Sequence, residues 1–146
     1  MNISRTLSVL VTVSLIAVCS LSQQAARDQG EDSAILHLQA LPAANPQLWK
    51  NVRTADDWQN PYLIIRTNYI SVHDLAAAVE FRIKPENLLV ALTGLPQSAW
   101  PYGRAVAVLE SGVLTSKDKK PTEDTRALVA RLLRKAKIEA IWIPPA

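Results

Sequence analysis

Residues 122–137 read TEDTRALVARLLRKAK, and residues 138–143 follow directly as IEAIWI. The first run is helical in pattern, since at about 100° per residue its apolar side chains share one face. These side chains are Leu128, Val129, Leu132, Leu133 and Ala136. The second run is rich in β-branched and aromatic residues and stops at Pro144. A helix that leads into a strand needs a sheet to pack on, so this stretch predicts an α+β domain.

We expect the helix to begin at Thr122, because threonine caps helices well and acidic residues follow it in the first turn. Residues 111–121 precede it with a run of lysines, which we interpret as a solvated loop tip. The polar side of the helix carries five cations. They are Arg126, Arg131, Arg134, Lys135 and Lys137.

The remaining strands can be placed from the preceding sequence. Residues 62–66 and 69–73 are β-rich runs joined by Thr67-Asn68, which predicts a β-hairpin. Residues 74–83 are ambiguous, because the Leu-Ala-Ala-Ala-Val segment favours a helix and the Phe-Arg-Ile segment favours a short strand. A third strand over residues 104–110 is apolar enough for the middle of a sheet.

A second helix is expected to start at Lys84-Pro85-Glu86 and to end near residues 94–96. Leucines at 88, 89, 92 and 95 form its apolar stripe. The fold class is therefore α+β, a small mixed sheet packed by two helices in the order β-β-α-β-α-β. The last strand should pair in parallel after a crossover.

Three segments are expected along the chain: an export signal or membrane anchor over residues 1–20, a polar linker and irregular segment over 21–60, and a compact α+β domain over 61–146. Residues 7–18 are apolar or Ser/Thr after a single N-terminal cation at Arg5. That run is shorter than the roughly 20 residues that span a bilayer, as in a signal peptide. We therefore expect a secreted or periplasmic bacterial protein, anchored at most through its N-terminus.

Cleavage before Leu21 or after Ser22 is compatible with the residues around the end of the apolar run. Alternatively, LIAVC at 15–19 resembles a lipobox, and Cys19 would then be lipid-modified. An uncleaved anchor is the third alternative. Cys19 is the only cysteine, so the exported domain has no disulfide and depends on its core.

The net charge of +3 is unevenly distributed. Residues 27–100 hold six Lys/Arg against eight Asp/Glu, whereas residues 102–146 hold nine against five. The basic character therefore belongs to the C-terminal part. It is too sparse for a nucleic-acid binder.

Catalytic motifs are not found, and we expect no enzyme activity, cofactor or metal site. His37 and His73 are the only histidines, and neither stands in a ligand-spaced pair. The Asp56-Asp57 pair is more typical of a solvated turn or a helix N-cap than of a metal or acid-base site. The alternative is a small secreted hydrolase or transferase that uses His73 with Glu80, Glu86 or Glu110.

The sequence also shows a resemblance. The chain contains, in order, Leu63, Ile65, Asn68, Ile70 and Val72, then Ile83-x-Pro-Glu-x-Leu-Leu, and then a helix ending Lys-Ala-Lys-Ile before Ile-Trp-Ile. This series of residues over positions 61–143 resembles the periplasmic domain of the ExbD/TolR family. The resemblance implies a domain that dimerises and contacts envelope proteins or the cell wall. The family's membrane aspartate has no counterpart in residues 7–18, so a motor role is not implied. Lys137 stands where the family tends to have glycine in a left-handed helix cap.

We therefore expect a non-catalytic envelope domain that acts in protein docking, assembly or cell-wall binding, and a homodimer is compatible with it. Its candidate partner-binding residues are Trp100, Tyr102, Arg131, Arg134 and Lys135. The partner would be an envelope protein or a cell-wall component. Ordinary core aromatics and a solvated basic helix face are the alternative reading of the same residues.

Overall fold

The computed structural model describes residues 26, 28–52, 54, 57–110 and 115–143. The chain divides into two units, Met1–Ser33 and Ala34–Ala146. In the first unit the described residues 28–33 are helical. The second unit holds the sheet, and it begins well before residue 61 because residues 34–60 belong to it. Residues 34–39 of this unit are helical, so part of the expected polar linker and irregular segment is regular structure.

The second unit is built around one mixed five-stranded sheet with the order β3-β2-β1-β4-β5. The strands β1, β2 and β3 pair antiparallel, whereas β1 with β4 and β4 with β5 pair parallel. Their bounds are β1 Tyr62–Ile65, β2 Ile70–Asp74, β3 Val79–Ile83, β4 Ala105–Glu110 and β5 Glu139–Ile143. The α+β class, the hairpin, the central strand and the parallel last step are thus confirmed.

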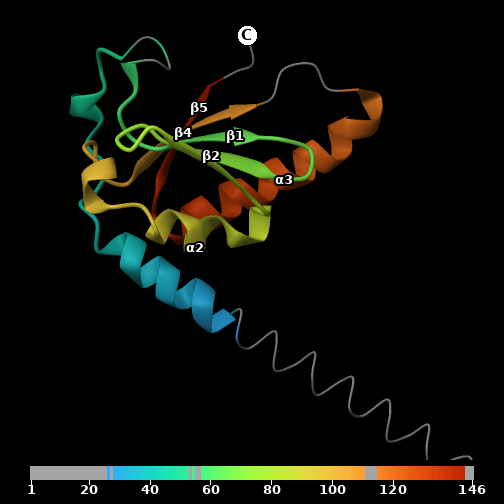
Figure 1. Cartoon of the computed structure of the whole chain (residues 1–146), viewed down its shortest axis with the longest axis horizontal. Helices are drawn as coiled ribbons and strands as arrows, with labels where there is room; N and C mark the ends of the chain where they lie inside the picture. Colours follow the sequence, from blue (N-terminus) through green and yellow to red (C-terminus); the bar gives the residue numbers. More distant parts are fainter. Residues whose placement is uncertain (1–25, 27, 53, 55–56, 111–114, 144–146) are drawn as a thin grey trace, which may run out of the picture. The chain divides into compact units, whose positions relative to one another are not determined.

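Two α-helices, α2 (Leu88–Thr93) and α3 (Ser116–Lys135), lie on one face of this sheet, as Figure 1 shows. Among the described residues, single-turn 3-10 helices include η1 Pro46–Leu48, η3 Pro85–Asn87 and η4 Gln97–Ala99. Alternate residues of the strands, such as Leu63, Val72 and Val106, face the helices and are buried with Leu88 and Leu132. Leu38, from helical residues 34–39, joins the same core.

The element order differs from the prediction by one strand, β3. Residues 75–78 form a turn rather than a helix, because the Asp74 carboxylate accepts hydrogen bonds from the backbone N–H groups of Ala76 (3.0 Å) and Ala77 (3.3 Å). Ala78 completes the turn in the left-handed region at φ 53°. The chain then reverses and β3 pairs with β2. Side-chain capping by Asp74 therefore overrides the helix propensity of the alanines.

The start of α3 also differs from the prediction. The helix begins at Ser116 with Thr115 as N-cap, so residues 116–121 are helical and Thr122 is a buried residue inside the helix. The Thr115 hydroxyl donates to the Asp118 carboxylate at 2.5 Å, and Lys120 pairs with Asp124 at 3.0 Å. These local contacts stabilise the first turns although Pro121 lies within them.

The end of α3 follows the expected left-handed cap. Lys137 has φ 55°, the Lys137 N–H donates to the Arg134 carbonyl at 3.1 Å, and the Ile138 N–H donates to the Leu133 carbonyl at 2.9 Å. This hydrogen-bond pair is the Schellman motif. It turns the chain directly into β5.

The strap, which we define as residues 42–52, 54 and 57–61, leads back toward the starts of β1 and β4. Buried Asn60 is its anchor: the amide group donates to the carbonyls of Gly103 and Ala105, both at 2.7 Å, and accepts from the Tyr102 N–H at 2.8 Å. Trp58 and Tyr102 pack with Ala105 and Ala107 against the sheet face opposite the helices. The strap thus covers part of that second face.

Candidate functional site

The basic face, which we define as Arg131, Arg134 and Lys135, is exposed along the last turns of α3. The opposite side of the same turns carries Leu132 and Leu133, which are buried in the core. Burial of the leucines therefore fixes the direction in which the cations point. The segment between Thr125 and Ile138 contains no Asp or Glu, so acidic neighbours on the helix do not neutralise this face.

The cations of this segment differ in their contacts. Arg126 pairs with Glu110 at 3.0 Å and lies 5.0 Å from the centre of the Trp142 ring, so it packs α3 against the sheet. Within the part of the chain that the structure describes, Arg131 and Arg134 form no ion pair. Arg134 and Lys135 in the last turn also complement the negative end of the helix dipole. Arg131 lies further from that end.

Trp100 and Tyr102 do not extend the basic face. Their exposed fractions are only 4% and 6%, and they belong to different clusters. Trp100 packs in the core beneath the helices, while Tyr102 lies in the cluster on the other face, 5.0 Å from Trp58 and 5.7 Å from Trp49 between ring centres. Burial removes both rings from an exposed binding surface, and they act as core aromatics.

His73 and Glu80 are brought together by the β2–β3 register. The His73 Nε2 atom lies 3.7 Å from Glu80 Oε1, and the imidazole ring stacks on the Tyr62 ring with 4.2 Å between centres. Burial lowers the pKa of His73, Glu80 raises it in part, and Arg66 lowers it further. The imidazole is therefore neutral at neutral pH, and its nearest carboxylate comes from β3, the strand that the sequence left ambiguous.

The other acidic residues considered as partners of His73 have different roles. Glu110 pairs with Arg126, and Glu86 is exposed in η3. Among the described residues, no group of three His, Cys, Asp or Glu side chains is arranged to hold a metal ion. Asp57 accepts a hydrogen bond from the Thr54 hydroxyl at 3.0 Å, as in a solvated turn, and Asp56 lies outside the described residues.

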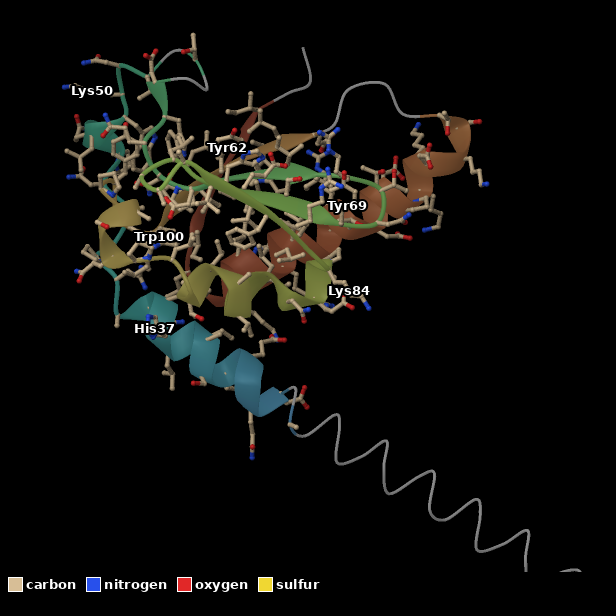
Figure 2. The ribbon with its side chains drawn as sticks, viewed as in Figure 1. His37, Lys50, Tyr62, Tyr69, Lys84 and Trp100 are labelled. Carbon is tan, nitrogen blue, oxygen red and sulfur yellow. The ribbon has the colours of Figure 1, made fainter. Side chains whose placement is uncertain are left out.

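Two of the hollows among the described residues lie away from the basic face and from the His73–Glu80 pair. One, of about 200 Å³, lies between residues 37–41 and the end of α2, and His37, Gln97 and Trp100 line it. Figure 2 shows His37 on its helix, well separated from Tyr62, which stacks on His73. The other, of about 560 Å³, is bordered by Trp58, Leu75 and Pro101. Neither is lined by His73 or by the basic face.

The residues proposed for export, Cys19 among them, lie outside the described residues. Where the structure describes the chain, none of its helices has the length and apolar character needed to cross a membrane. Comparison of the chain with protein-family models, with curated proteins and with solved structures finds no match. The resemblance to the ExbD/TolR family therefore stays a prediction.

Proposed function

We propose that the chain is an exported protein of the bacterial cell envelope, and that its α+β domain is a non-catalytic docking module. The basic face is the surface that we assign to docking. One observation carries this proposal: Arg131 and Arg134 are exposed on a rigid helix and, among the described residues, form no ion pair. A partner with an acidic surface, either an envelope protein or an anionic cell-wall component, fits such a face.

Rigidity supports this choice of surface. The turns that carry the basic face are held by buried Leu132, Leu133 and Ala136, and the Schellman motif fixes the end of the helix. Because the backbone of these turns is already fixed, the binding of a partner costs little further backbone conformational entropy. Exposed charges of this kind mainly raise the association rate and make binding sensitive to salt.

Charge reversal tests the docking surface. The partner is first captured from a cell-envelope extract with the wild-type chain. The triple change Arg131→Glu, Arg134→Glu and Lys135→Glu should then weaken binding to that partner at least about tenfold. The matched control is Lys117→Glu with Lys119→Glu, which reverses two exposed charges in the first turns of the same helix. Equal binding by the triple variant and the wild type would refute the proposal.

Export has its own test, which is the mass of the mature N-terminus. A chain that starts at Leu21 is a free exported protein, a lipidated Cys19 is an anchored one, and an intact Met1 retains the apolar segment. Recovery of intact Met1 in the cytoplasmic fraction would contradict export.

The second candidate function is acid-base catalysis by His73 and Glu80, which the 3.7 Å contact favours. A neutral imidazole next to a carboxylate could accept a proton from a nucleophile. If this function operates, His73→Asn and Glu80→Gln should each lower hydrolysis of the same chromogenic ester or amide at least about 100-fold, in line with the usual contribution of such catalysis. Equal turnover by the wild type and both variants removes this candidate.

A further inference from the structure

The hollow of about 200 Å³ lies between the helical residues 34–39 and the end of α2. Leucines of both elements form its apolar wall, and its polar groups come from His37, Gln97 and Trp100. Figure 2 shows His37 and Trp100 on different segments of the chain. An engineered apolar cavity of roughly 150 Å³ in another protein binds benzene. The hollow is therefore large enough for a single-ring molecule with one small polar substituent.

The indole N–H of Trp100 is the feature that points to a ligand. Trp100 is only 4% exposed, and both of its backbone groups are used: the N–H donates to the Gln97 carbonyl at 3.1 Å, and the carbonyl accepts from the Gly103 N–H at 2.9 Å. Within the described part of the chain, the indole N–H has no hydrogen-bond acceptor, whereas that of buried Trp58 donates to the Pro61 carbonyl at 3.2 Å. A buried indole N–H normally has an acceptor, so this donor is available to a molecule in the hollow.

The Trp100 indole N–H also keeps some access to open space. It is not one of the unpartnered side-chain atoms that are sealed from solvent, although almost all of the residue is buried. The hollow is a space that Trp100 lines, and it provides this access. A ligand there can therefore reach the N–H without any rearrangement of the core.

We propose that this hollow binds an uncharged small molecule that has one apolar ring and one carbonyl group. The ring packs against the leucines, and the carbonyl oxygen accepts a hydrogen bond from Trp100 Nε1. Exposed His37 and Gln97 meet the rest of the polar substituent, since each side chain can both donate and accept.

The lining decides the charge of the ligand. Among the described residues that line the hollow, none is Asp, Glu, Lys or Arg, so a charged ligand would lack a partner of fixed opposite charge. The helical residues 34–39 and α2 both end beside it. The last carbonyl groups of a helix carry partial negative charge and disfavour an anion in particular.

Three single-ring probes test the site in the full, isotopically labelled chain by nuclear magnetic resonance. Benzamide has the ring and the carbonyl, benzoate has the same shape with a negative charge, and toluene has no carbonyl. Benzamide should shift the Trp100 indole N–H signal, which is identified by its loss in Trp100→Phe, with a dissociation constant of about 1 mM or lower. Benzoate should bind at least about tenfold more weakly than benzamide.

The Trp100→Phe variant separates the hydrogen bond from the shape of the hollow, because phenylalanine keeps an aromatic ring and lacks the N–H. The backbone amide signals of Leu92 and Leu95 follow binding in this variant. It should bind benzamide at least about threefold more weakly than the wild type, and toluene within about twofold of the wild type. The control Trp49→Phe, in the other core cluster, should leave benzamide binding unchanged.

Each of three results would overturn the proposal: no shift of the Trp100 signal at about 10 mM benzamide, tenfold above the expected constant, equal binding of benzoate and benzamide, or an equal loss of benzamide and toluene in Trp100→Phe. If Trp100→Phe does not fold, the comparison of benzamide with benzoate in the wild type still decides. The hollow is not lined by the basic face, so this site and docking are tested separately.

Discussion

Replacing Asn60 by Ala should destabilise the compact unit by about 2–4 kcal/mol. The change removes three hydrogen bonds of 2.7–2.8 Å that join the strap to residues 102–105, the start of β4. Each bond contributes about 1 kcal/mol net, and the buried carbonyls and N–H left behind add a desolvation cost. Asn60→Asp should be worse, since a carboxylate would then face two carbonyl oxygens with no proton to donate.

Equilibrium unfolding in urea, followed by tryptophan fluorescence, measures this loss directly. Trp58 belongs to the strap and Trp142 to the sheet, so the tryptophan fluorescence follows the unfolding of both regions. Asn68→Ala, at an exposed turn position, is the matched control and should change the free energy of unfolding by less than about 0.5 kcal/mol. If Asn60→Ala is as mild as that control, the strap is not an integral part of the domain.

Three further predictions concern the cap, a close backbone approach and a titrating group. Lys137 has a φ of 55° at the helix end, a conformation that is less strained for glycine. Lys137→Gly should therefore stabilise the fold by about 1 kcal/mol, seen as a rise in Tm of about 4 °C. An unchanged or lower Tm would contradict a left-handed conformation at this helix cap. Gly103→Ala places a Cβ 2.3 Å from the Ala43 carbonyl oxygen at a φ of 77°, and should cost at least about 2 kcal/mol in urea unfolding; a loss under about 0.5 kcal/mol would refute the close approach. Because burial lowers the pKa of His73, the unfolded chain binds a proton more readily than the folded chain, so stability should fall as the pH drops below about 6.5 toward the lower pKa of the folded state. His73→Gln should flatten that part of the stability profile, and an identical profile in both proteins would contradict the lowered pKa.

The parts of the fold that follow from sequence are those with a long or regular pattern. The stripe from Leu128 to Ala136 predicts the buried face of α3, and the apolar run from Ala105 predicts a central strand, because burial on both faces requires such a run. The hairpin follows from two β-rich runs around Thr67-Asn68. In each case the local preference and the tertiary packing agree.

The features that sequence did not predict depend on single side chains or on distant contacts. One Asp74 carboxylate converts an alanine-rich segment into a turn and creates β3. The contact between His73 and Glu80 follows only once that turn is known, because the turn sets the register. Asn60 binds residues more than 40 positions away, and no local pattern indicates such a pairing.

The candidate site shows the same division. The exposure of Arg131 and Arg134 follows from the 3.6-residue period of α3, since the buried leucines leave them on the outside. The burial of Trp100 and Tyr102 does not follow from any periodic pattern, because both residues lie in an irregular segment. Trp100 packs in one core cluster and Tyr102 in the other. An aromatic residue in a turn is compatible with either a surface or a core, and only the packing decides between them.

Photo-crosslinking in intact cells tests the proposed docking surface most directly. A photoreactive amino acid replaces Arg131 in one strain and Lys117, in the first turn of α3, in another. We predict a discrete crosslinked product at position 131, in the envelope fraction, that is lost with Arg134→Glu and Lys135→Glu and is not formed from position 117. Docking through the basic face would be contradicted if position 131 gave no product, or if positions 131 and 117 gave the same products.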